Sequence, residues 1–298
     1  MKSLALSMLA IASMAAMSSC SSENDPVDEV IAGNQEKVEI KLSAGVVKAE
    51  TKAAVDTWSD TEVAFANKVG DGAYTTTPWN ATIATDGSVN FVETHYYEAD
   101  GKTTYLIGYY PRGTQSNGTV TYTLTGEDDI MVSQELSGTK SSTINKDDAK
   151  FQFGHLLSQL KLIVKAGENF DTGVKVTKIT LKGTKKNATL TLGTTSSLKF
   201  EGDAADMDVY TGNADIASST EPIKTIMVEP GVADMRLDIT TDAGTTYSDI
   251  PITIADASDN KTAVNTAYDI TLTFNKKAIE ATASITAWKT GTGSADVF

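Results

Sequence analysis

Apolar and polar residues alternate along most of this chain. Alternation with a period of two places successive side chains on opposite faces of a strand, so each run predicts a strand with one buried and one solvated face. Turn-forming glycines and aspartates separate many runs, as at 70–72, 183–185 and 242–244. The pattern therefore predicts an all-β protein, with one short helical window at 155–160. The clearest runs are Val38/Ile40/Leu42, Val120/Tyr122/Leu124, Leu160/Leu162/Val164, Met235/Leu237/Ile239 and Tyr268/Ile270/Leu272/Phe274.

The length of the chain predicts two domains. With 298 residues it can bury two separate cores. Short antiparallel strands in a chain of this size favour two β-sandwiches in tandem over one barrel. A polar stretch at 137–150 followed by the apolar segment 151–157 marks the passage from one core to the next. We expect an N-terminal sandwich over 36–158 and a C-terminal one over 159–298.

The N-terminus has the features of a bacterial lipoprotein leader. Lys2 precedes an apolar run at 4–17 that is too short to span a bilayer but matches the core of a signal peptide. The run ends in small residues before the only cysteine, Cys20, which predicts cleavage between Ser19 and Cys20 and lipidation of the thiol. The alternative is an ordinary secretory signal, cut after Ala16 or Ser19. Residues 1–19 are thus predicted to be a signal peptide.

Residues 20–35 have the composition of a lipidated acidic tether. The stretch 21–29 contains one apolar residue and a proline, which disfavours regular structure. The whole chain is acidic, with a formal charge of −14, so binding to nucleic acid is not expected. With Cys20, the only cysteine, committed to lipid, no disulfide and no thiolate metal site are expected.

The residues with catalytic potential do not form a known constellation. The two histidines, His95 and His155, lie far apart in the sequence without a metal-ligand spacing, and no nucleophile elbow is present. The acidic run 256–260 has calcium-ligand residue types, but Ala267 occupies the position of the bidentate glutamate of an EF-hand. We expect no enzyme activity, no cofactor and no metal.

Aromatic residues around His95 have two interpretations. His95 is followed by Tyr96 and Tyr97, which either form half of a sugar-stacking surface or pack within a hairpin. His155 follows two alternating phenylalanines and is expected to pack or to form a hydrogen bond at the end of a strand.

Several segments in order along the chain resemble the fimbrillin family of the Bacteroidetes, the subunits of type V pili. The acidic stretch after the lipoprotein leader is similar to a surface-export signal, or it is a plain linker. A first strand follows at 38–42. No single segment is specific, and the resemblance depends on their order. The carrying segments are Thr51-Lys52-Ala53, Trp58-Ser59-Asp60, Tyr109-Tyr110-Pro111, Asp128-Asp129-Ile130-Met131, 151–164, 265–274 and Ile285-Thr286-Ala287-Trp288.

The resemblance implies a fold and a route of assembly. The fold is two transthyretin-like β-sandwich domains. A lipoprotein precursor is cut by a trypsin-like protease, and the matching position lies between Lys52 and Ala53, where arginine is usual before the cut. If the protease requires arginine, the protein keeps its first strand and its lipid and is an anchor or a non-polymerising member. Loss of the first strand leaves a groove that the C-terminal strand of another subunit fills by β-addition. The candidate donor is 279–298, with Ile279, Ala281, Ala283, Ile285 and Trp288 as its apolar residues. Alternatively, this segment is the last strand of its own domain.

The function indicated by these features is that of a structural or adhesive subunit of a cell-surface fimbria. Its expected location is the outer membrane, surface-exposed, or the fimbrium. Its expected partners are other fimbrial subunits, the outer membrane through the lipid of the precursor, and a host or bacterial surface ligand. The alternative is an outer-membrane surface lipoprotein that binds glycans, and an extracellular hydrolase comes third because catalytic carboxylates cannot be recognised among so many acids.

Overall fold

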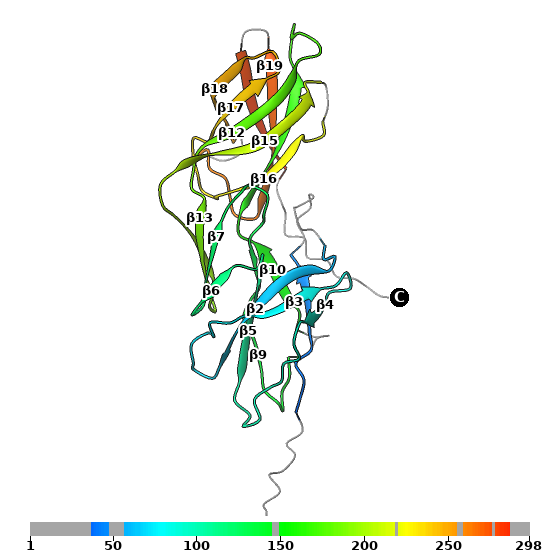
Figure 1. The fold of residues 1–298 in the computed structure, drawn as a ribbon, viewed down its shortest axis with the longest axis vertical. Helices are drawn as coiled ribbons and strands as arrows, with labels where there is room; N and C mark the ends of the chain where they lie inside the picture. Colours follow the sequence, from blue (N-terminus) through cyan, green and yellow to red (C-terminus); the bar gives the residue numbers. More distant parts are fainter. Residues whose placement is uncertain are drawn as a thin grey trace, which may run out of the picture. The chain divides into compact units, whose positions relative to one another are not determined.

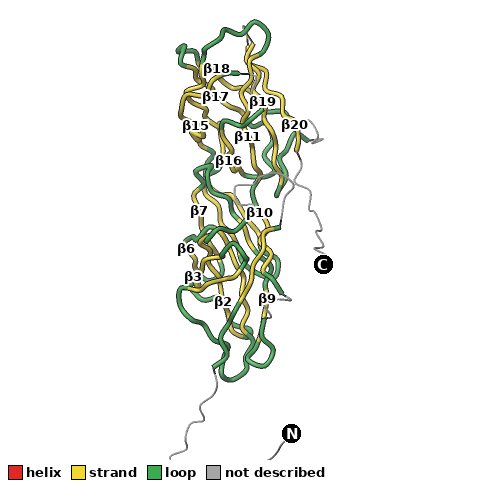
Figure 2. Tube along the Cα trace, turned by 90° about the vertical axis from the view of Figure 1, so that its right-hand side faces the viewer, coloured by secondary structure: helices red, strands yellow, loops and turns green. Residues whose placement is uncertain are grey.

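The chain divides into two units, residues 1–36 and 37–298. The computed structural model describes 37–47, 57–144, 149–217, 220–254 and 259–275, and the backbone of 278–286. Its described part forms twenty β-strands and no helix (Figure 2). The all-β prediction is confirmed, whereas the helical window at 155–160 was wrong. Those residues belong to two strands that follow each other closely, β10 (Phe151–His155) and β11 (Ser158–Ala166).

The first half of the chain builds a sheet that closes on itself. An eight-stranded sheet has the order β2-β3-β4-β1-β10-β8-β5-β9, and an additional pairing of β2 with β5 closes seven strands into a ring (Figure 1). Its strands are β1 (Leu42–Val46), β2 (Thr61–Val69), β3 (Trp79–Ile83), β4 (Ser88–Phe91), β5 (Thr104–Tyr110), β8 (Met131–Val132), β9 (Leu136–Gly138) and β10. The first half of the chain therefore contains a closed, barrel-like sheet.

Aromatic side chains fill the interior of this ring. Phe65 meets Phe151 edge to face with ring centroids 5.1 Å apart, and Trp58 meets Phe153 in the same way, also at 5.1 Å. Edge-to-face pairs add to the stabilisation that burial provides. Gly108 on β5 leaves the room these rings need, because a Cβ there would lie 2.3 Å from the ring of Phe153.

The second half forms a sandwich of two four-stranded sheets. One has the order β16-β11-β19-β20 and the other β15-β12-β17-β18. Alternate residues of the facing strands, such as Leu160, Ile179, Leu237 and Ile270, are buried in one hydrophobic cluster between the sheets. The strands are β12 (Lys175–Thr184), β15 (Ala205–Asp215), β16 (Lys224–Val228), β17 (Arg236–Thr241), β18 (Thr246–Pro251), β19 (Thr266–Asn275) and β20 (Ala278–Thr286).

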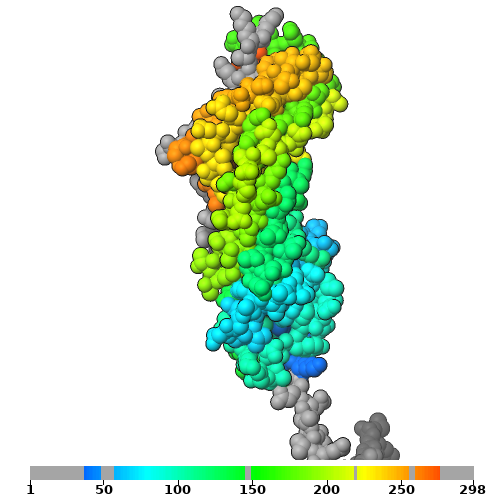
Figure 3. Space-filling view, turned by 60° about the vertical axis from the view of Figure 1, so that its left-hand side comes forward, coloured from blue at the N-terminus to red at the C-terminus, as the bar shows by residue number. Residues whose placement is uncertain are grey.

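A fourth sheet, with shorter strands, joins strands from both halves of the sequence. Its order is β14-β13-β7-β6, built from β6 (Thr114–Ser116), β7 (Thr119–Thr123), β13 (Asn187–Thr191) and β14 (Ser197–Glu201). Leu190 on β13 pairs with Val120 on β7, and both are buried. Figure 3 shows the two hairpins side by side at the surface, in green and yellow-green. The hairpin 187–201 thus lies apart from the sandwich core that surrounds it in the sequence.

Candidate functional site

The residues predicted for processing fall in two groups. Ser19, Cys20, Lys52, Ala53 and Trp288 lie outside the described residues. The four apolar positions Ile279, Ala281, Ala283 and Ile285 lie on strand β20. The described residues that bear on assembly are therefore the first strand, which precedes Lys52, and the last.

Strand β1 lies between two neighbours within the ring. It pairs in parallel with β10, where Ala44 lies opposite Phe151, and antiparallel with β4, where Leu42 lies opposite Val89. Ile40, Leu42 and Ala44 are each at most 4% exposed. A strand with partners on both sides and its alternate residues in the core is an integral part of the sheet.

The segment around β1 is also tied down by hydrogen bonds from its ends. The Ile40 N–H donates to the carbonyl of His95 at 2.9 Å, and the Val47 N–H donates to the carbonyl of Phe153 at 2.9 Å. The Ala44 N–H donates to the carbonyl of Gly87 at 2.8 Å. Gly87 has a φ of +85°, and a Cβ there would lie 2.6 Å from the carbonyl oxygen of Ala44. Only glycine both adopts this turn and lets β1 approach so closely.

Strand β20 lies at the edge of its sheet. It pairs antiparallel with β19 along its whole length, from Ala267 opposite Thr286 to Asn275 opposite Ala278. In the described part of the chain β19 is its one sheet partner. An edge strand has one unpaired row of backbone N–H and C=O groups, which can template pairing with another chain.

An aromatic hollow lies beside the start of β3. The indole of Trp79 and the imidazole of His95 stack face to face, with ring centroids 3.9 Å apart and an interplanar angle of 7°. Burial lowers the pKa of His95, against the opposing effect of the Glu93 carboxylate. The neighbours of His95 point elsewhere: Tyr97 is buried and its hydroxyl accepts the Ile144 N–H at 2.7 Å. The stacking partner of His95 is thus Trp79, and neither adjacent tyrosine.

The sequence of the chain matches one family of proteins. A profile of that family, described as fimbrillin-like, matches residues 47–288, which is most of the chain. The chain belongs to the fimbrillin-like family. The resemblance read from the ordered segments is therefore confirmed. As a fimbrillin-like protein, the chain is a structural protein and not an enzyme. No protein of curated function matches it in sequence.

Solved structures similar to this fimbrillin-like chain are adhesion candidates from Bacteroides. A candidate cell adhesion protein of Bacteroides uniformis is 19% identical with a TM-score of 0.62, covering 85% of this chain and 99% of that one. One from Bacteroides ovatus is 18% identical with a TM-score of 0.58 and the same coverage, 85% and 99%. One from Bacteroides fragilis is 13% identical with a TM-score of 0.53, covering 87% and 100%. At these identities the likeness concerns the fold.

The fimbrillin-like chain also contains a buried polar pair, Asp129 and His155. The Nδ1 atom of His155 contacts the Asp129 carboxylate, and both side chains are fully buried. Burial raises the pKa of Asp129, while the contact with His155 acts in the opposite direction. His155 ends β10, as the sequence predicted for a histidine that bonds at a strand end. The pair joins β10 to the chain just before β8, which is a structural role.

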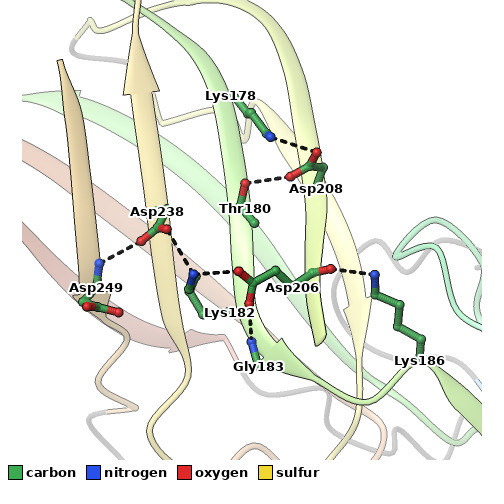
Figure 4. Close-up of polar contacts among 9 residues, drawn as sticks. All are labelled: Lys178, Thr180, Lys182, Gly183, Lys186, Asp206, Asp208, Asp238 and Asp249. Atoms are coloured by element: carbon green, nitrogen blue, oxygen red, sulfur yellow. Dashed lines mark hydrogen bonds and ion pairs between the residues drawn. The ribbon is translucent and has the colours of Figure 1, made fainter. Parts of the chain in front are cut away.

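The outer face of the sheet β15-β12-β17-β18 contains a ladder of ion pairs across the strands (Figure 4). Lys182 Nζ lies 2.6 Å from Asp206 and 3.3 Å from Asp238, and Lys178 Nζ lies 2.9 Å from Asp208. Hydrogen bonding from Lys182 holds the pKa of the Asp206 carboxyl below its usual range. The charges satisfy one another on a solvated surface, where water and salt screen each pair and keep its contribution to stability small.

The described residues hold no group of three or more His, Cys, Asp or Glu suited to a metal ion. From the calcium-like run, Asn260 instead accepts the Ile254 N–H at 2.5 Å and so caps its own loop. No helix in the described part of the chain has the length and apolar character of a membrane span.

Proposed function

We propose that this protein is a structural or adhesive subunit of a cell-surface fimbria in the Bacteroidetes. Membership of the fimbrillin-like family carries the proposal. Similarity in fold to candidate adhesion proteins of Bacteroides supports it. The subunit functions by assembly and adhesion at the cell surface, without a cofactor.

Export begins with the leader at 1–19. Signal cleavage before Cys20 and lipidation of its thiol anchor the precursor in the outer membrane, and the acidic tether at 20–35 connects the anchor to the folded part. A second cut, between Lys52 and Ala53, then frees the subunit from this anchor. The cut lies after β1 in the sequence, so it also separates β1 from the rest of the chain.

The position of β1 explains why its loss promotes assembly. Without it, the seven-strand ring opens between β4 and β10, and both strands acquire an unpaired edge. The ring also loses Ile40 and Leu42 from its core. A strand from another subunit that fills the groove buries apolar surface, which stabilises the complex by about 25 cal/mol for each Å² buried. It also restores the backbone pairing of β4 and β10, so we expect it to bind tightly.

The donor strand is the C-terminal segment 279–298. In the single chain its first part pairs with β19, as expected of the last strand of its own domain. Donation therefore requires β20 to leave that edge, or the segment beyond it to bind first. Because β20 has a sheet partner on one side only, it can leave without opening the sheet in two.

The family resemblance also implies two tandem transthyretin-like domains, which we assign to 36–158 and 159–298. Separate hydrophobic clusters in the ring and in the sandwich support this division. The hairpin 187–201 departs from it, because it pairs with β7 of the first domain.

The mass and N-terminal residue of the protein shed from intact producing cells test this function. We expect an unacylated chain that starts at Ala53 and is recovered in oligomers. A Lys52→Ala variant should remain acylated at Cys20 and need detergent for release, while Lys52→Arg should be processed like the wild type. If the wild-type protein is found only as an acylated monomer that starts at Cys20, strand-exchange assembly is contradicted. The protein would then be an anchored lipoprotein.

A further inference from the structure

The hollow beside Trp79 has the size and position of a ligand site. Its volume is about 490 Å³, within the range of about 300–1,000 Å³ typical of small-molecule sites. It lies where β2 extends past β3: Phe65 pairs with Trp79 at the start of β3, and Asn67 comes two residues further along β2. The residues that matter for binding are Asn67, Thr77, Trp79, Asn80, Glu93 and His95.

One wall of the hollow is a fixed aromatic stack. Phe91 contacts both stacked rings edge to face, with centroids 5.8 Å from Trp79 and 5.1 Å from His95. Three rings that hold one another in place lose little conformational freedom on binding. Val92, which is 71% exposed, adds apolar surface at the rim. A flat ring face of this kind suits the apolar face of a sugar ring.

The amide of Asn67 supplies a second, independent observation. Asn67 is 5% exposed, and its Nδ2 atom has no hydrogen-bond partner among the described residues. A buried donor without a partner lowers stability, so an unpaired amide in the lining of a hollow points to a ligand oxygen that accepts its hydrogen bond. The backbone of Asn67 is held in place, because its carbonyl accepts the Thr75 N–H at 2.9 Å.

The charges of the lining residues define the class of ligand. Glu93 is the one acidic residue that lines the hollow, and the described lining includes no Lys or Arg. Burial lowers the pKa of His95, which favours its neutral form. The lining thus offers a carboxylate, amides and threonine hydroxyls around an aromatic face. That chemistry disfavours anions and suits a neutral ligand with several hydroxyl groups.

We propose that this hollow binds a neutral saccharide. The sugar ring lies against the Trp79–His95 stack, and a sugar oxygen accepts a hydrogen bond from the Asn67 amide. Glu93 accepts hydrogen bonds from sugar hydroxyls. A second hollow of about 320 Å³ shares Glu93 and His95 with the first and continues beside Ile40 and Leu42, so more than one sugar unit fits. The first hollow is lined by no residue before Asn67, so binding there does not require β1. The second hollow is lined in part by residues 39–42, which a cut after Lys52 would remove.

Calorimetric titration and saturation-transfer NMR of the purified full-length protein test the proposal. The neutral probes are N-acetylglucosamine, lactose and cellobiose, and glucuronate is the anionic probe. We expect at least one neutral probe to bind with a dissociation constant of about 1 mM or below. Trp79→Ala and Asn67→Ala should each weaken binding roughly tenfold, the effect of about 1.4 kcal/mol.

The controls separate a binding defect from misfolding. Asn67→Ala removes a buried amide that makes no hydrogen bond through Nδ2, and a cooperative melting transition of this variant shows that weaker binding is not caused by misfolding. Tyr96→Ala removes a neighbouring aromatic that is 43% exposed and does not line the hollow, and it should bind normally. Absence of binding by all three neutral probes, equal binding of glucuronate, or unchanged binding by both variants would each overturn the proposal. None of these outcomes bears on the N-terminal processing that tests the fimbrial function.

Discussion

The first and last strands of the chain occupy contrasting places in their sheets. Strand β1 has a partner on each side and helps to close the ring, whereas β20 pairs on one side and lies at the edge of a sandwich. Taking out β1 creates two unpaired edges and a gap in a core, while moving β20 exposes one edge of β19. The comparison shows that the chain carries a strand whose removal leaves a gap and another that can leave without breaking its sheet.

Disulfide locks on each strand test this comparison most severely. Ser43 on β1 lies opposite Ser88 on β4, so the double variant Ser43→Cys/Ser88→Cys locks β1 to β4 when oxidised. Thr271 on β19 lies opposite Thr282 on β20, so Thr271→Cys/Thr282→Cys locks β20 to β19. We expect both oxidised variants to lose assembly into denaturant-stable oligomers, because one keeps its groove filled and the other keeps its donor. Reduction should restore assembly in both. Assembly by the oxidised β20 lock would show that β20 stays in its own domain.

Removal of β1 should have the largest effect on stability. A chain that starts at Ala53 loses the buried Ile40, Leu42 and Ala44 and the backbone bonds of β1. We expect its free energy of unfolding to fall by about 5 kcal/mol, since each large apolar side chain contributes about 1.5–3 kcal/mol and each hydrogen bond about 1. Urea unfolding followed by the fluorescence of Trp58 and Trp79 measures this loss. A chain starting at Lys37 is the control, and equal stability of the two would contradict the integral place of β1.

A comparison of two glycines measures how much the close approach of β1 to the turn at Gly87 contributes to stability. Gly87 and Gly244 have similar φ values, +85° and +76°, but only the Gly87 position has a neighbour, Ala44, within reach of an added Cβ. Gly244→Ala should cost about 1–2 kcal/mol from backbone strain alone. Gly87→Ala should cost about 1–3 kcal/mol more, because β1 must shift. Denaturant midpoints of both variants give the difference, and equal losses would argue against tight docking of β1.

The smallest effect should come from pH. Burial lowers the pKa of His95 in the folded state, so the unfolded chain binds a proton more readily as the pH falls through about 6.5. Stability of the ring should therefore decrease modestly from pH 7 to pH 5, because His95 is only partly buried. Melting temperatures of the wild type and of His95→Gln across this range should converge at the acidic end. The same slope in both proteins would exclude His95 as its source.

Strands with one solvated face could be predicted from the sequence. Leu237 and Ile239 lie in β17 and the run ending in Phe274 lies in β19, with these residues buried and the residues between them partly exposed. Strand β2 gave no such signal, because all of Val63 to Asn67 is buried. One face of β2 meets the ring core and the other meets the fourth sheet through Ala64 and Ala66. A strand covered on both faces shows no alternation.

The amino-acid sequence by itself determined the strand-rich class and the family, because local periodicity and ordered short segments encode them, and it predicts a lipoprotein leader. Only the tertiary structure decided which strands are neighbours. The closure of β2 onto β5, the pairing of the hairpin 187–201 with β7, and the stacking of Trp79 on His95 all join residues that are distant along the chain. The physical reason is that pairing and stacking depend on register and on the path of the backbone, and strand periodicity specifies neither.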